Sequence, residues 1–339
     1  MKTKKSKIKS ILLFLILSAI PFLNIVNCEL GTPPDGDGGG GGSTNGTFYA
    51  LDDAADAIYA YDGPNSLNGE ITQSRTITGS DTKISNATAM AVDPSRDILY
   101  VTDTTDQNVL VFAPASTQDG NKAPARKYPG VKKAGALFID EINDRLYVAD
   151  VTDKEIKVWN GVSTLADGAA LTRSIKLDFV PAGFTVDTKK DILYIGDPTS
   201  TSVKAYVNAS TLSGNATPSR TIKNSTTAFV NLNGLAMNSD TDLLFVSESG
   251  GKSVEMFDQA STLNGDVAAT RELKGGNTGF TINQRGILFR SNSIYVIQND
   301  TAVGVWDNAN QLKDDVAPTR ALTLKGASRI ISIALDPAN

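Results

Sequence analysis

"LYVTDTTDQNVLVF" (Leu99–Phe112) has close copies elsewhere in the chain: "LYVADVTDKEIKVW" from Leu146, "LYIGDPTSTSVKAY" from Leu193 and "LFVSESGGKSVEMF" from Leu244. Each copy contains two runs of β-branched and aromatic residues separated by a polar turn, and such runs are typical of short β-strands. Because one pattern recurs along the chain at a nearly constant interval, we expect a fold built from repeated units.

Three markers extend the repeat to six units. The first aromatic residue of the pattern recurs at Tyr49, Tyr100, Tyr147, Tyr194, Phe245 and Tyr295. The second recurs at Tyr61, Phe112, Trp159, Tyr206, Phe257 and Trp306. An arginine follows at Arg75, Arg126, Arg173, Arg220, Arg271 and Arg320, and the intervals run from 47 to 51 residues. Three markers that keep the same spacing indicate true repeats.

Each unit contains four strand-like runs. In the second unit they are residues 89–93, 98–103, 108–112 and 125–130, and turn residues separate them. Four short strands in a unit of this length are typical of a propeller blade. The sequence therefore predicts an all-β fold, a six-bladed β-propeller with four antiparallel strands per blade.

The two ends of the repeat region predict how the ring closes. The first unit begins with the second strand of a blade, Phe48–Asp52, whereas the chain ends with an extra innermost strand, Ser332–Asp336. We expect this last strand to complete the first blade, which would cover two exposed sheet edges. One propeller domain is thus predicted over residues 47–339.

The innermost strands begin with small residues. Their first positions are Ala89, Ala136, Gly183, Gly234, Gly286 and Ser332. Because six inner strands converge on one axis, we expect little room for large side chains there.

The N-terminus has the pattern of an export signal. Five lysines precede an apolar run, Ile11–Leu23, and "IVNC" (Ile25–Cys28) follows. This segment resembles the lipobox of bacterial lipoproteins, although Asn27 replaces the usual small residue before the cysteine. The resemblance implies a signal peptide over residues 1–27 and a diacylated Cys28. A plain cleaved signal and a retained membrane span remain alternatives.

Residues 28–46 are rich in glycine and aspartate and are expected to form a flexible tether. The tether would have a root-mean-square reach of about 23 Å. Glu29 stands where aspartate marks retention in the inner membrane of some diderm bacteria. We therefore expect export across the inner membrane and lipid anchoring in the outer membrane, with the face, periplasmic or surface, left open.

Composition excludes several classes of chemistry. The chain has no histidine and only one cysteine, which excludes histidine acid–base catalysis, histidine metal ligands and an internal disulfide. Without residues 1–27, 27 basic residues face 37 acidic ones, a net charge of −10, because those residues carry five lysines and no acid. This charge disfavours nucleic acid as a partner. A monomer held to the membrane by its lipid is expected.

The repeat itself resembles known propeller families. "YVAD" (Tyr147–Asp150) followed by "IKVW" (Ile156–Trp159) resembles NHL-repeat and YVTN-type propellers. "ASTLSGNATPSRTI" (Ala209–Ile222) resembles the outer segment of propellers in secreted bacterial lipoproteins. These resemblances imply the fold and not the activity.

Acidic residues end the second strand of most units, at Asp52, Asp103, Asp150, Asp197 and Glu248, with Gln298 in the sixth. They suggest two interpretations, a ring of cation ligands or carboxylates that accept hydrogen bonds from the amides of their own turns. The second is favoured because a residue present in every blade usually has a structural role. For the same reason each repeated arginine is expected to pair or stack within its own blade.

Ligand-binding candidates are the residues just before the inner strands, where the repeats differ most. They are Asn86, Lys133, Asn231, Asn233, Gln284, Arg285 and Arg329. Amides with scattered positive charge suit a carboxylate, a sugar or a peptide, while ordinary solvated loops are the alternative interpretation.

Two functional classes remain. The first is a non-enzymatic binding or scaffold module for a protein, peptide or glycan at the channel mouth, including a periplasmic assembly factor. The second is a calcium-dependent lactonase, esterase or lyase with an axial calcium, as in six-bladed enzymes that the repeat resembles. The sequence has no Gly-rich phosphate loop or serine triad motif, so we predict no catalytic residue, no metal ligand and no cofactor apart from that possible calcium.

Overall fold

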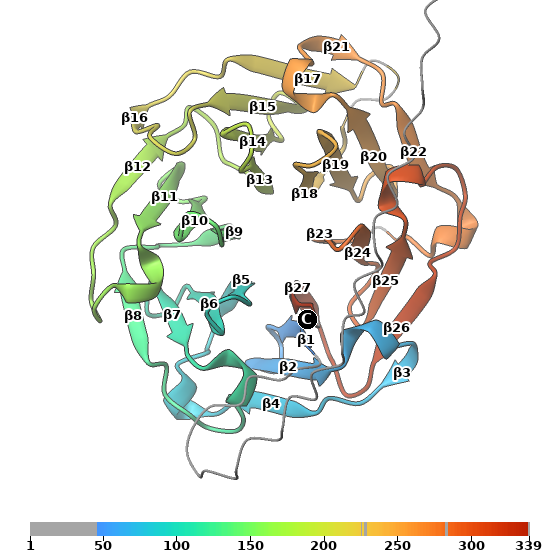
Figure 1. The fold of residues 1–339 in the computed structure, drawn as a ribbon. Helices are drawn as coiled ribbons and strands as arrows, with labels where there is room; N and C mark the ends of the chain where they lie inside the picture. Colours follow the sequence, from blue (N-terminus) through green and yellow to red (C-terminus); the bar gives the residue numbers. More distant parts are fainter. Residues whose placement is uncertain (1–45, 225, 227–228, 282–283, 338–339) are drawn as a thin grey trace, which may run out of the picture. The chain divides into compact units, whose positions relative to one another are not determined.

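The computed structural model describes residues 46–224, 226, 229–281 and 284–337. In these residues, 27 β-strands form six separate sheets placed around a central channel (Figure 1). The prediction of an all-β, six-bladed propeller is confirmed. The predicted signal peptide, Cys28 and the tether up to residue 45 lie outside the described residues.

Blades are numbered along the chain, and each is given from the channel outward. Blade 1 contains β27 (Ile330–Asp336), β1 (Thr47–Asp52), β2 (Ala57–Asp62) and β4 (Arg75–Thr78). Blade 2 contains β5 (Ala87–Asp93), β6 (Ile98–Asp103), β7 (Asn108–Phe112) and β8 (Arg126–Pro129). Blade 3 contains β9 (Ala134–Asp140), β10 (Arg145–Asp150), β11 (Glu155–Asn160), β12 (Arg173–Lys176) and the short β16 (Gly214–Asn215).

The second half of the ring follows the same plan. Blade 4 contains β13 (Phe184–Asp187), β14 (Ile192–Asp197), β15 (Ser202–Val207), β17 (Arg220–Asn224) and the short β21 (Gly265–Val267). Blade 5 contains β18 (Leu232–Asn238), β19 (Leu243–Glu248), β20 (Ser253–Asp258) and β22 (Arg271–Lys274). Blade 6 contains β23 (Ile287–Arg290), β24 (Ser293–Ile297), β25 (Ala302–Asp307), β26 (Arg320–Leu324) and the short β3 (Gly69–Ile71).

Short 3-10 helices lie mainly after the third strand of a blade. They are η1 (Pro64–Ser66), η2 (Ser80–Thr82), η3 (Ala115–Thr117), η4 (Val162–Thr164), η5 (Ala260–Thr262), η6 (Gly276–Thr278) and η7 (Ala309–Gln311). No helix in the described part of the chain has the length and apolar character needed to cross a bilayer.

The C-terminal strand closes the ring as predicted. β27 pairs antiparallel with β1, from Thr47 opposite Asp336 to Asp52 opposite Ile330, so strands from both ends of the described chain share one sheet (Figure 1). Ile330 is fully buried. This pairing leaves β1 without a free edge inside the ring.

The prediction of four strands per blade was incomplete. β3, β16 and β21 add a fifth, parallel strand to β26, β12 and β17. Each added strand comes from the next unit around the ring. These strands have only two or three residues and no apolar alternation, so sequence patterning does not reveal them.

The prediction that the repeated arginines act within their own blades was also incomplete. Arg126 on β8 donates to the carbonyl oxygens of Ser163 and Leu165 in blade 3, at 2.6 and 3.1 Å. Arg320 on β26 donates to the carbonyl oxygen of Pro64 in blade 1, at 2.8 Å, across the point of ring closure. Own-blade bonds are also present in the pairs Arg75–Asp62, Arg173–Asn160, Arg271–Asp258 and Arg320–Asp307. The arginines therefore connect neighbouring blades, because a guanidinium has donors to spare after one partner is satisfied.

The apolar core lies between the blades. Each of the six buried clusters combines side chains of two adjacent blades. Trp159 of blade 3 stacks on Tyr128 of blade 2 with ring centroids 6.4 Å apart, and Phe48 of blade 1 stacks on Tyr295 of blade 6 at 6.1 Å. Each blade thus buries its faces only against its neighbours, so the ring is stabilised as a whole.

Two glycines at or just before the start of an inner strand show how closely neighbouring backbones approach there. A Cβ atom on Gly183 would lie 2.6 Å from the Cα atom of Gly234. A Cβ atom on Gly234 would lie 3.0 Å from the backbone nitrogen of Ile287. The expected crowding is confirmed at these positions.

Candidate functional site

The channel has two ends, named here by the course of the inner strands. The inner strands begin at the top mouth and end at the bottom mouth. The second strands run in the opposite direction, so they end at the top mouth with their acidic residues.

The strand-end acids hold the loops of the top mouth together. Asp103 accepts hydrogen bonds from the amides of Thr105 and Asp106 in its own turn, both at 3.0 Å. Its other oxygen accepts from the amides of Ser85 and Asn86, both at 2.9 Å. The structural interpretation of these acids is confirmed, and it extends to the loop before the inner strand.

The same arrangement recurs around the ring with local changes. Asp52, Asp150 and Asp197 accept hydrogen bonds from the amides of their own turns. Glu248 accepts from the amide of Val230, and Gln298 donates to the carbonyl oxygen of Thr278. Within the described residues, no group of three or more acidic or cysteine side chains is arranged to hold a metal ion.

Four of the seven predicted binding residues stand apart on the rim of the top mouth. The side chains of Asn86, Lys133 and Asn231 are exposed. Arg329 forms a two-pronged ion pair with Asp53, with both N–O distances at 2.7 Å. These four residues are not gathered into one site.

The other three predicted residues meet where β18 and β23 begin. Asn233 donates to the carbonyl oxygen of Gln284 at 2.7 Å, and the buried amide of Gln284 donates to Ser247 at 2.8 Å. Arg285 donates to the carbonyl oxygen of Ile330 at 2.8 Å. Of the seven candidates, only Asn233 and Arg285 line the channel.

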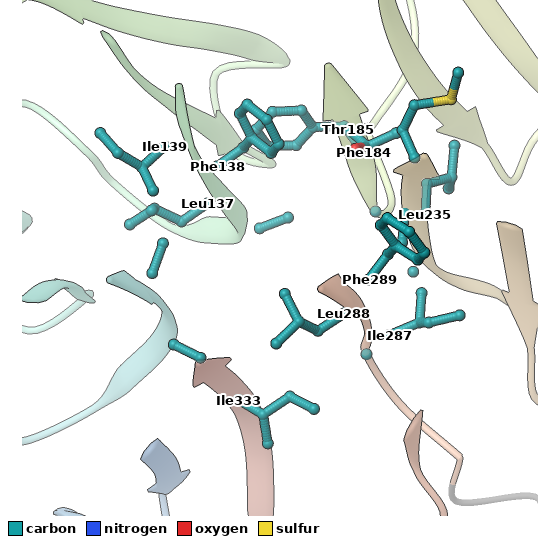
Figure 2. Close-up of a pocket in the computed structure, with 18 of the residues that line it drawn as sticks. Leu137, Phe138, Ile139, Phe184, Thr185, Leu235, Ile287, Leu288, Phe289 and Ile333 are labelled. Atoms are coloured by element: carbon teal, nitrogen blue, oxygen red, sulfur yellow. The ribbon is translucent and has the colours of Figure 1, made fainter. Parts of the chain in front are cut away.

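Apolar and polar side chains together line a cavity of about 510 Å³ inside the channel. Leu137 from β9, Leu288 from β23 and Ile333 from β27 project toward the open centre (Figure 2). Phe138 and Phe289 add aromatic surface to the wall. The expected lack of room for large side chains thus concerns only the first positions of the inner strands, and large apolar side chains line the cavity further along them.

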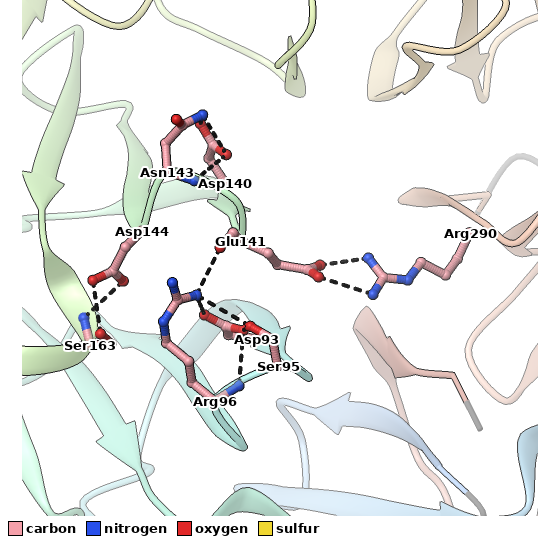
Figure 3. Close-up of polar contacts among 9 residues, drawn as sticks. All are labelled: Asp93, Ser95, Arg96, Asp140, Glu141, Asn143, Asp144, Ser163 and Arg290. Carbon is pink, nitrogen blue, oxygen red and sulfur yellow. Dashed lines mark hydrogen bonds and ion pairs between the residues drawn. The ribbon is translucent and has the colours of Figure 1, made fainter. Parts of the chain in front are cut away.

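An ion pair crosses the bottom mouth of this cavity. Arg290, the last residue of β23, donates from Nη1 to Oε1 of Glu141 at 2.5 Å and from Nη2 to Oε2 at 3.1 Å. Glu141 follows β9, and blades 3 and 6 are three places apart in a ring of six, so the pair spans the channel (Figure 3). Both side chains are partly buried, with exposed fractions of 25% for Glu141 and 29% for Arg290.

Neighbouring groups fix the position of Glu141. Arg96 donates to the backbone oxygen of Glu141 at 2.7 Å and pairs with the buried Asp93 at 2.7 Å (Figure 3). The next residue, Ile142, is 80% exposed at the same mouth. At the bottom mouth, the ion-paired Glu141 thus lies next to Ile142, an apolar side chain exposed to solvent.

Asp336, at the end of β27, is affected by the charges of Glu141 and Arg290. Burial, then the negative charge of Asp97, raise its pKa to about 6, with a smaller raising contribution from Glu141. The positive charge of Arg290 acts in the opposite direction. Arg290 therefore acts electrostatically on Asp336 as well as on Glu141.

Sequence reasoning missed the lining residues and the ion pair. The available signal was the run "GALFID" (135–140) and the run "GILFR" (286–290), in which large apolar residues follow one another without alternation. A strand whose two faces both meet apolar surroundings produces such a run. Compared with "AMAVD" (89–93), these runs mark the inner strands that fill the channel wall.

Comparison with known proteins adds support for the fold. No protein-family profile and no curated protein matches the chain. Among solved structures, a chain in "Crystal structure of Nidogen/Laminin Complex" matches with a TM-score of 0.58 and 13% sequence identity, over 87% of this chain and 99% of that chain. At this identity the match concerns the fold alone, and it agrees with a β-propeller. The resemblance to NHL-type repeats and the lipoprotein interpretation stay predictions.

Proposed function

We propose that this propeller is a non-catalytic binding module whose ligand places an apolar group in the central channel. The observation that carries the proposal is the cavity of about 510 Å³ with Leu137, Leu288 and Phe289 in its wall. Ligand sites commonly have volumes of about 300–1,000 Å³, with mostly apolar walls and few polar groups. Partly exposed apolar side chains at such a site are available to contact a ligand.

The wall chemistry favours some ligands over others. A ligand with both apolar and polar surface, such as a peptide, a protein side chain or a small molecule, matches a wall in which Leu137 and Phe289 lie beside Asn238. The similar chain belongs to a structure described as a complex of nidogen and laminin, which is compatible with a propeller acting as a scaffold for a protein.

The proposal is tested with a substitution that fills the channel. The measured quantity is the dissociation constant of a neutral fluorescent probe, N-phenyl-1-naphthylamine. Leu288→Trp is expected to weaken probe binding at least tenfold, because the larger side chain takes up ligand space. Val207→Trp is the matched control, since Val207 is 39% exposed at the end of β15 and does not line the channel. It should leave the dissociation constant within twofold.

Two results would contradict the proposal. One is equal probe binding by both tryptophan variants, which would place the site outside the channel. The other is calcium-dependent hydrolysis of a lactone or ester by the purified protein, which would favour the enzyme alternative.

We further propose that the module is lipid-anchored at Cys28 in the cell envelope. The motif at Ile25–Cys28 and the glycine-rich tether support this proposal. Two acyl chains anchor a protein stably, because each buried methylene contributes about 0.8 kcal/mol. Cys28→Ser should therefore move the protein from the membrane fraction to the soluble fraction after cell lysis. Retention of the variant in the washed membrane fraction would exclude this anchor.

A further inference from the structure

The bottom mouth of the channel already contains a carboxylate-binding arrangement. The two terminal nitrogens of Arg290 face the two carboxylate oxygens of Glu141, at 2.5 and 3.1 Å. This two-pronged geometry is the one by which arginine recognises carboxylates in general. Here the occupant is a side chain of the protein itself, reaching across from the opposite blade (Figure 3).

Arg290 is well placed to exchange its partner. Among the described residues that line the cavity, the basic ones are Arg285 and Arg290. Arg285 is engaged at the top mouth by the carbonyl oxygen of Ile330 and by Asp300, both at 2.8 Å. The only hydrogen-bond partner of the Arg290 guanidinium in the described structure is the carboxylate of Glu141.

Other charged groups at this mouth have partners of their own. Arg96 is bound to Asp93, and Lys189 is paired with Asp240. Asp140 accepts two hydrogen bonds from the side-chain amide of Asn143 (Figure 3). Release of Glu141 from Arg290 therefore leaves these contacts in place.

We propose that the channel binds a small apolar molecule with one carboxylate, which displaces Glu141 from Arg290. This inference rests on the proposed function, because it uses the same cavity. The alkyl or aryl part lies among Leu137, Leu288 and Ile333, and the carboxylate takes the position of the Glu141 carboxylate. One carboxylate replaces another, so the charged hydrogen bonds are conserved.

Burial of the apolar part then drives binding. Each additional buried methylene should tighten binding about fourfold. A neutral ligand of the same shape gains the burial but cannot replace Glu141 on the guanidinium. Exchange at the Glu141–Arg290 ion pair thus gives a carboxylate ligand higher affinity than a neutral ligand of the same shape.

The experiment compares octanoate with octan-1-ol on the full chain by displacement of the neutral fluorescent probe. Octanoate is expected to bind at least tenfold more tightly than octan-1-ol. Glu141→Gln removes the internal competitor and should tighten octanoate binding about tenfold. Arg290→Gln should weaken octanoate binding at least tenfold, to the level of octan-1-ol, whose own affinity stays within twofold in both variants.

The matched control is Asp53→Asn, which breaks the equivalent two-pronged pair with Arg329 at the top mouth. It should change neither affinity by more than twofold. Because the two test variants are expected to shift octanoate binding in opposite directions, loss of folding in one of them cannot imitate the pattern.

The outcomes separate this inference from the proposed function. Equal binding of octanoate and octan-1-ol, unchanged in both variants, would overturn the carboxylate inference and leave the apolar channel site intact. Failure of both compounds and of the probe to bind would overturn both. Binding of an apolar peptide through its C-terminal carboxylate, without binding of octanoate, would also overturn the assignment to a small acid.

Discussion

A chain that ends at Arg329, and so lacks β27, is expected to lose its cooperative fold. β27 supplies the innermost strand of blade 1, with six residue pairs to β1. Its removal uncovers Ile330, Ile333 and Leu335, and the burial of each such side chain contributes about 2 kcal/mol. That loss, together with the ladder hydrogen bonds, approaches the whole stability of a typical domain, about 5–15 kcal/mol.

Circular dichroism and limited proteolysis of the truncated chain measure this effect. A peptide of residues 326–339 should restore the cooperative transition, whereas the same peptide with Ile333→Lys and Leu335→Lys should not. A truncated chain that unfolds cooperatively at the wild-type temperature would show that ring closure is dispensable.

Lys157→Met is expected to destabilise the fold by about 3 kcal/mol. Lys157 is 5% exposed, and its Nζ lies 2.7 Å from an oxygen of the fully buried Asp150 and 2.7 Å from an oxygen of Asp153. Burial alone would raise the pKa of Asp150 and lower that of Lys157. Their mutual hydrogen bond and the amides around Asp150 outweigh burial, so the pKa of Asp150 is lowered and that of Lys157 is raised.

The pH dependence of this effect follows from those directions. Because the folded-state pKa of Asp150 is lowered, its contribution to stability is complete above the ordinary aspartate pKa and is lost as pH falls through the lowered value. The free energies of unfolding of wild type and Lys157→Met should therefore differ at pH 7 and converge in strong acid. Urea denaturation at both pH values measures this.

Lys204→Met is the matched control for Lys157→Met. Lys204 occupies the same position in blade 4, is 18% exposed and lies 3.4 Å from Asp197. Because this ion pair is longer and more exposed, it contributes less to the free energy of unfolding, about 1 kcal/mol at most. Equal destabilisation by the two substitutions would contradict the role assigned to the buried lysine.

The sequence was sufficient for the fold because the signals for blades are local. The bounds of β6 and β7, Ile98–Asp103 and Asn108–Phe112, agree with the predicted strands. The role of Asp103 was predictable because its partners lie two and three residues ahead in its own turn. Ring closure was also predictable, since an unpaired β27 has one free partner, β1.

The channel site was not predictable in the same way. Glu141 and Arg290 are 149 residues apart, and they meet only because their blades are opposite in a ring of six. The predicted rim residues, such as Asn86, are exposed, and their role stays a prediction. The cavity lining combines residues of all six inner strands, and that combination exists only in the closed ring.

Methyl NMR spectroscopy of the intact protein, titrated with octan-1-ol, tests the central claim most directly. The account predicts saturable shifts at the methyl groups of Leu137, Leu288 and Ile333, which line the channel. The exposed Val207 and Val316, which do not line the cavity, should not shift. Shifts confined to the outer residues, or none at any concentration, would contradict the claim that the central channel is the ligand site.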